Sequence, residues 1–275
     1  MESFLAARHA RGECVLWCER KGRLLWTDVQ AATLWACEAG SGSIRSWPMP
    51  EPLCCFALTG SDDRLLLGLA SGLAFFSFSS GRVQRIRSAG AKLPGTRLGS
   101  GRCDRQGRFV FGMAGEETHP QGGGGIYRLN LDLSLERLPV AAANAKGICF
   151  SPDGRRMYFA DAAAGDIRHA GYNPCSAEVG RVRLFVAAGA APGAPGGATV
   201  DAEGCLWGAR HGAGQLVRFA PDGRPERVIE LDAAQPGCPA YGGPGLSTLY
   251  ASTTAGVLRQ VMDLRGLPEP RFLHA

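Results

Sequence analysis

The sequence has 275 residues, 45% of them hydrophobic and 20% charged, which is enough apolar surface for a packed core and excludes a disordered chain or a small disulfide-stapled module. The formal net charge is +5, but 27 of the 30 basic residues are arginines spread along the chain, and no basic cluster interleaved with aromatics predicts a nucleic-acid surface. The sequence also contains no apolar run of about 18 residues, so we expect neither nucleic acid nor a membrane as a partner.

The ten cysteines show no paired metal-ligand spacing. Reduced thiols that pack as small hydrophobic side chains are the expectation for such cysteines in a cytosolic protein. The first residues lack the basic and apolar segments of a secretory signal. We therefore predict a cytoplasmic location.

A repeat dominates the chain: a polar turn with glycine, a short apolar strand, a stretch of small residues and a second strand. The residues just before the first of these strands stand at positions 23, 64, 108, 156, 205 and 248, which are 41, 44, 48, 49 and 43 residues apart. A period in the forties that holds several strands is typical of one propeller blade. The repeat, together with 39 glycines for the turns, predicts an all-β, six-bladed β-propeller with four-stranded antiparallel blades.

Further strands are expected between the copies of the repeat, at 33–37, 44–47, 125–129 and 215–220. The segment 187–197 is rich in Gly, Ala and Pro and is predicted to be a connecting loop. Because the repeat resumes in step after this segment, we expect a single propeller domain over residues 1–275.

Several stretches, in order along the chain, resemble the SMP-30/gluconolactonase family of six-bladed propellers, which includes regucalcin. Within that family the sequence is most similar to bacterial sugar 1,4-lactonases. The resembling stretches are residues 12–17, 25–28, 97–104, 106–108, 112–117, 147–154, 199–207 and 241–244.

This resemblance implies a divalent cation on the propeller axis (Ca, Zn, Mn or Fe), held by a glutamate, an asparagine and an aspartate. Such an ion polarises the lactone carbonyl and positions the attacking water. The glutamate falls on Glu13, but the asparagine falls on Lys146 and the aspartate on Gly196. Only one carboxylate of the implied ligand set therefore remains, and an amine takes the place of another ligand.

The resemblance also implies substrate contacts. The family arginine is kept, whereas its asparagine and aspartate neighbours, and a methionine on the next strand, are replaced by smaller residues. A histidine falls near the pocket rim, and a glutamate is kept on the lid side. The predicted substrate-binding residues are Arg97, Gly99, Ser100, Ala114, Glu117, Gly196 and His211.

A cation beside Lys146 would be repelled with only Glu13 to offset the repulsion, so we expect no metal and no other cofactor. Asn144 stands two positions earlier and becomes a ligand if the strand is shifted. In that alternative, Glu13 and Asn144 hold a divalent ion.

Three functions remain open at this stage. The first is a lactonase-type propeller whose metal site has been rewritten, by divergence or engineering, into a metal-poor pocket for a small molecule. In it, Lys146 with Glu13 performs Schiff-base, retro-aldol or general-base chemistry. The second is a metal-dependent sugar 1,4-lactone hydrolase of the gluconolactonase or arabinonolactonase type. The third is a non-catalytic binding propeller, in which Lys146 and Glu13 form an ion pair. We expect a monomer or weak dimer in each case.

Overall fold

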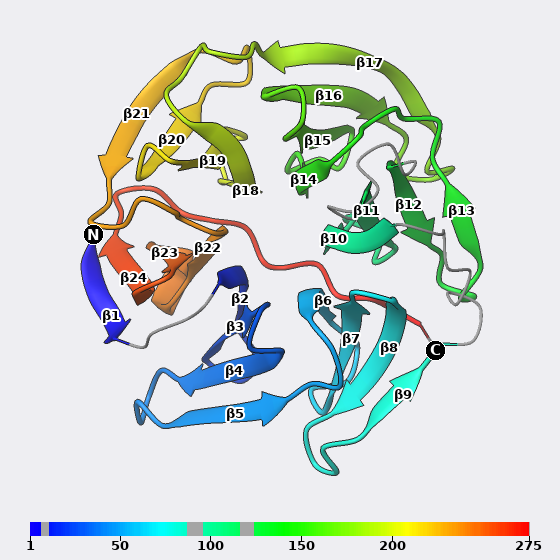
Figure 1. The fold of residues 1–275 in the computed structure, drawn as a ribbon, viewed down its shortest axis with the longest axis vertical. Coiled ribbons are helices and arrows are strands. Elements are labelled where there is room, and N and C mark those ends of the chain that lie inside the picture. The colour runs from blue at the N-terminus through cyan, green and yellow to red at the C-terminus, as the bar shows by residue number, and fades with distance from the viewer. Residues whose placement is uncertain (7–10, 87–95, 116–123, 275) are drawn as a thin grey trace.

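The computed structural model describes residues 1–6, 11–86, 96–115 and 124–274. These residues form six four-stranded antiparallel sheets arranged as blades around a central axis (Figure 1). The six-bladed all-β prediction is therefore confirmed. The second strands of the blades begin at or next to the predicted repeat positions, because the turn signals fix where each apolar strand starts.

The strands of the first three blades follow one another from the axis outward. Blade 1 contains β2 (Gly12–Cys18), β3 (Arg23–Asp28), β4 (Thr33–Glu38) and β5 (Ile44–Pro48). Blade 2 contains β6 (Leu53–Leu58), β7 (Arg64–Leu69), β8 (Gly72–Ser77) and β9 (Val83–Arg85). Blade 3 contains β10 (Thr96–Cys103), β11 (Phe109–Gly115), β12 (Gly125–Leu129) and β13 (Leu135–Arg137).

The last three blades continue the ring. Blade 4 contains β14 (Ala145–Phe150), β15 (Arg156–Asp161), β16 (Asp166–Tyr172) and β17 (Val179–Val186). Blade 5 contains β18 (Ala194–Val200), β19 (Leu206–His211), β20 (Gln215–Phe219) and β21 (Pro225–Glu230). Blade 6 contains β22 (Pro239–Gly242), β23 (Thr248–Thr253), β24 (Gly256–Val261) and β1 (Glu2–Ala6), with a short 3-10 helix, η2 (Pro244–Leu246), before β23.

The two ends of the chain close the ring in blade 6. Strand β1 pairs antiparallel with β24, with Glu2 opposite Arg259 and an ion pair of 2.8 Å between their side chains. Pairing the first strand with the last blade completes its four strands, closes the ring and covers the free edge of β24. The sequence repeat did not reveal this pairing.

The predicted loop at 187–197 is only partly a loop. Strand β18 begins at Ala194, and Pro195 pairs with Arg210 of β19, so Gly196 and Gly197 belong to the innermost strand of blade 5. Glycine weakens a strand, but here close packing requires it: a β-carbon at Gly197 would lie 2.7 Å from the Cα of Cys238. The close contact with Cys238 therefore outweighs the low preference of glycine for strands.

Five of the six innermost strands break their regular pairing near the middle of the strand. The shifts fall between Glu13 and Leu16, Leu53 and Cys55, Leu98 and Gly101, Lys146 and Cys149, and Pro195 and Ala198. Such β-bulges bend a strand and redirect its side chains. Here each of them begins in the first half of its strand.

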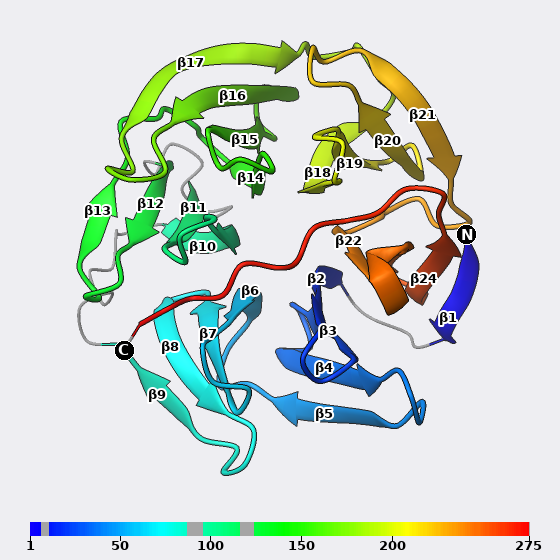
Figure 2. The same ribbon diagram turned by 180° about the vertical axis from the view of Figure 1, so that it is seen from behind.

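After β24, residues 262–274 cross the ring as a C-terminal strap, seen from both sides in Figures 1 and 2. The strap binds the face at which the innermost strands end: the amide of Gly266 donates to the Leu246 carbonyl, and Phe272 bridges to Thr59. At its centre Glu269 pairs with Arg102 at 2.9 Å. None of the described residues lies in a helix with the length and hydropathy needed to span a bilayer.

The Arg102–Glu269 pair is predicted to stabilise the closed ring. The side chains are only 8% and 14% exposed, and Arg102 also donates to the Ala198 carbonyl, so Glu269→Ala leaves a buried guanidinium without its counter-charge. We expect this change to lower the free energy of unfolding by about 3–5 kcal/mol. Urea unfolding measures it.

Glu2→Ala is the matched control, because it removes an exposed pair and should cost less than about 1 kcal/mol. If Glu269→Ala and Glu2→Ala lower the free energy of unfolding equally, the buried pair between Arg102 and the strap stabilises the fold no more than a surface pair does.

Candidate functional site

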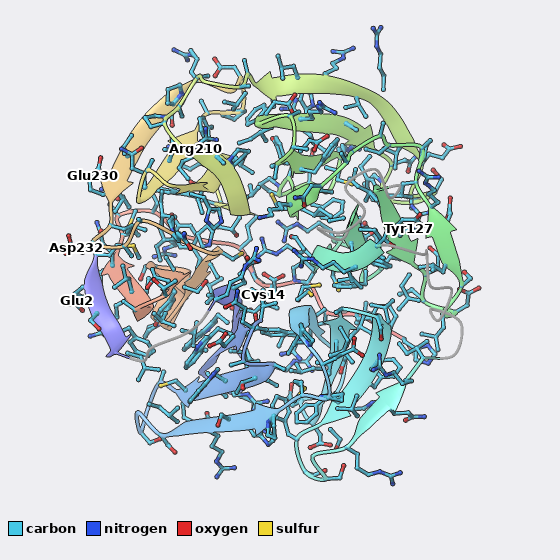
Figure 3. The ribbon with its side chains drawn as sticks, viewed as in Figure 1. Glu2, Cys14, Tyr127, Arg210, Glu230 and Asp232 are labelled. Atoms are coloured by element: carbon cyan, nitrogen blue, oxygen red, sulfur yellow. The ribbon has the colours of Figure 1, made fainter. Side chains whose placement is uncertain are left out.

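A cavity opens on the axis where the first halves of the innermost strands converge. It encloses about 760 Å³ of space, its open mouth included. Figure 3 labels one lining residue, Cys14, close to the centre of the ring. The wall also contains Leu16, Val29, Gly101, Gly147, Ile148, Gly197 and Ala198.

The structure brings eight of the ten predicted site residues to this cavity. They come from blades 1, 3, 4 and 5 and their connections, and they are Glu13, Arg97, Gly99, Ser100, Ala114, Asn144, Lys146 and His211. Gly196 is buried directly behind the ring of His211. Glu117 lies outside the described residues.

Glu13 is held in place from two sides. Its Oε1 accepts a hydrogen bond from Nε of Arg11 at 2.8 Å, and its backbone carbonyl accepts one from the Thr27 hydroxyl at 3.0 Å. The carboxylate of Asp28 accepts the backbone amide of Arg11 at 3.1 Å and so anchors the start of β2. The only carboxylate among the described lining residues is therefore already paired with a guanidinium.

Lys146 stands just before the bulge of β14. The carboxylate of Asp161 accepts the amides of Ala143 and Asn144, each at 3.2 Å, and thereby fixes how the chain enters the strand. Burial lowers the pKa of the Lys146 amine, the guanidiniums of Arg11 and Arg97 lower it further, and Glu13 partly offsets them. The amine thus lies in a partly desolvated, positively charged environment.

His211 occupies space that opens at Gly196. A β-carbon on Gly196 would lie 2.7 Å from Cδ2 and 2.8 Å from Nε2 of His211, so a side chain at that position would require the imidazole to move. Burial lowers the pKa of His211, and the nearby Lys146 lowers it further. The imidazole is therefore neutral at pH 7 and able to accept a proton.

The thiols of the cavity wall are unreactive. Burial raises the pKa of Cys54 to about 11, although Arg97 acts to lower it, and burial likewise raises the pKa values of Cys14 and Cys238. A nucleophilic cysteine needs the opposite shift. All ten cysteines are free, as the sequence predicts.

The donor set does not fit the divalent cation that the family resemblance implies. Glu13 is paired with Arg11, an amine stands at position 146, and the position of the expected aspartate is a glycine covered by His211. Within the described residues, no group of three or more His, Cys, Asp or Glu side chains is placed to hold a metal ion. Asn144 and Glu13 together supply only two donor side chains.

Sequence reasoning missed five polar groups of the wall: Arg11, Cys14, Cys54, Arg102 and Cys238. Arg11 could have been found, because it stands two positions before Glu13, which was already a candidate, at the entry to β2. Arg102 and the cysteines give no such signal, since the bulges decide which side chains face the axis.

A protein-family comparison matches residues 11–255 to the SMP-30/gluconolactonase/LRE-like region. The chain belongs to this family. Family membership agrees with the resemblance found in the sequence and with the propeller architecture.

The chain is similar to two characterised lactonases. It is 46% identical over 242 residues to L-arabinolactonase of Azospirillum brasilense, which covers 86% of this chain and 79% of the relative. It is 29% identical over 247 residues to 6-deoxy-6-sulfogluconolactonase of Pseudomonas putida, covering 88% and 83%.

Among solved structures, the calcium-binding protein regucalcin from Agrobacterium tumefaciens superimposes with a TM-score of 0.89 at 24% identity, covering 97% of this chain and 95% of that one. This likeness supports the fold.

The electrostatic coupling across the cavity yields a prediction. Lys146→Met removes a positive charge near His211, so the pKa of His211 should rise toward its ordinary value without reaching it, because burial persists. Histidine-selective NMR titration measures the shift. Lys21→Met, at an exposed site, should leave it unchanged. A pKa of His211 that is the same in both variants would show that the amine and the imidazole do not interact.

Proposed function

We propose that this protein hydrolyses a sugar lactone in the central cavity, with amine and imidazole groups in place of a dication. Family membership and the 46% identity to an L-arabinolactonase support the reaction class. The observation that carries the proposal is the fit between Gly196 and His211, in which a base fills the space of an expected metal ligand.

His211 is the proposed general base. Its lowered pKa keeps the ring neutral, so it can take a proton from a water molecule as the water oxygen attacks the lactone carbonyl carbon. The bond between the former carbonyl carbon and the ring oxygen of the lactone then breaks. The proton passes from the His211 imidazolium to that leaving oxygen. The product is an open-chain hydroxy acid.

Lys146 is the proposed electrophilic group. Its ammonium stabilises the negative charge that develops on the carbonyl oxygen, and Arg97 adds positive charge to the same cavity. Glu13 acts as a positioning residue, because its carboxylate favours the charged form of Lys146 against burial. Preorganised positive charge in a partly desolvated site is effective because it needs no rearrangement during the reaction.

The first test is hydrolysis of L-arabino-1,4-lactone, followed by acid release with a pH indicator. His211→Asn removes the base and should lower kcat by about 100-fold or more. Lys146→Met should also lower kcat by about 100-fold, whereas Lys146→Arg keeps the charge and should retain part of the rate. Lys21→Met serves as the control with unchanged activity.

A chelator separates this proposal from a metal-dependent hydrolase that uses Glu13 and Asn144. Wild-type activity should survive prolonged treatment with EDTA. Loss of activity with EDTA, and its return with manganese or calcium, would contradict the proposed mechanism and restore the metal-dependent alternative.

A second candidate reaction is Schiff-base chemistry at Lys146, favoured by the burial that lowers the pKa of its amine. The neutral amine nitrogen would attack an aldehyde carbon and release water to give an imine. Borohydride trapping with glyceraldehyde should then add mass at Lys146. An unmodified Lys146 after trapping counts against this reaction, and failure of both reactions leaves a binding propeller.

We also propose that the partner is a small molecule bound in the central cavity of a monomer or weak dimer. The mostly buried, unpaired cysteines support the proposed cytoplasmic location, because thiols stay reduced there.

A further inference from the structure

The cavity wall carries more positive than negative charge. Among the described lining residues, the cationic side chains are Arg11, Arg97, Arg102 and Lys146, and Glu13 is the acidic one. Arg11 is paired with Glu13 at 2.8 Å, and Arg102 with Glu269 of the strap at 2.9 Å. Arg97 and Lys146 have no carboxylate within ion-pair distance among the described residues.

These two cations stand close enough to influence each other. Burial lowers the pKa of Lys146 most, Glu13 acts to raise it, and Arg11 and then Arg97 act to lower it. Both side chains are half-buried, so solvent screens their repulsion less than it would on the surface. An anionic ligand group would relieve this repulsion, whereas a neutral ligand would not.

A simple sugar lactone satisfies only one of the two cations. Its carbonyl oxygen becomes negative only during the reaction, and the product has a single carboxylate. If the carbonyl faces Lys146, neither the lactone nor a carboxylate of the described lining residues pairs with the guanidinium of Arg97. A guanidinium presents a planar pair of donors that matches a carboxylate.

The wall beside Arg97 is made of small residues. Arg97 pairs in register with Ala114, and Gly99 and Ser100 follow it on β10. A β-carbon on Gly99 would lie 3.6 Å from the Gly112 carbonyl oxygen, an ordinary contact distance, so packing does not require glycine there. Arg97, Gly99, Ser100 and Ala114 all line the cavity, so the guanidinium shares its part of the wall with small residues.

We propose that the substrate is an acidic sugar lactone, with a second anionic group bound by Arg97 in the space beside Gly99, Ser100 and Ala114. This inference rests on the proposed function in one respect: that the group which reacts is a lactone. The anion site itself depends only on the charge and shape of the wall.

Equilibrium binding tests the anion site without turnover. Isothermal titration calorimetry compares D-glucarate, with two carboxylates, with D-gluconate, with one, and neutral D-glucitol. Wild-type protein should bind glucarate at least about tenfold more tightly than gluconate, since one charge-assisted contact is added. Higher ionic strength should reduce this preference.

Arg97→Met should bring the affinity for glucarate down to near that for gluconate, with a much smaller loss of gluconate affinity. Arg45→Met, on the exposed outer strand β5, is the matched control and should keep the preference. Equal wild-type affinities for the two acids would overturn the proposal. An equal loss of both acids in Arg97→Met would also overturn it, because Arg97 would then hold the shared carboxylate.

Hydrolysis assays separate the two proposals. If D-glucono-1,4-lactone and D-glucaro-1,4-lactone are hydrolysed with the same kcat/KM, the proposal of an acidic substrate is wrong and the proposal of lactone hydrolysis is supported. If glucarate binds preferentially but neither lactone is hydrolysed, the proposed function is wrong and the anion site stands.

Discussion

The pairing of β1 with β24 is the constraint on which the rest of the molecule depends. Because the first strand completes the last blade, that blade has four strands like the other five, and the ring is closed. In a regular strand, side chains alternate strictly between the two faces. The bulges in the innermost strands of five blades interrupt this alternation and redirect side chains near the cavity.

In the proposed function, two residues act in place of the groups that the family resemblance implies. His211 lies against Gly196, and Lys146 stands at the bulge of β14 with its entry segment fixed by Asp161. These two residues belong to different blades. Burial and the positive amine both lower the pKa of the imidazole, and the imidazole needs to be neutral to act as a base. The proposed mechanism is therefore consistent with the charges of the cavity.

The sequence predicted most of the scaffold because each blade repeats the same turn and strand signals, and strands such as β3 and β7 begin where those signals stand. It also identified Lys146 and His211. It did not predict that the Gly196 segment is a strand, since its glycines are required by contacts with distant residues. Nor did it predict the strap, whose residues have no counterpart in the repeat and whose partners lie in other blades.

The strap closes one end of the central axis of the propeller. Arg102 lines the cavity and also pairs with Glu269, so the passage along the axis ends at this contact between wall and strap. A reactant and its product must consequently use the same mouth, one after the other. Under the proposed lactone hydrolysis, the negatively charged product would leave past Lys146 and Arg97, so we expect its departure to depend on the ionic strength.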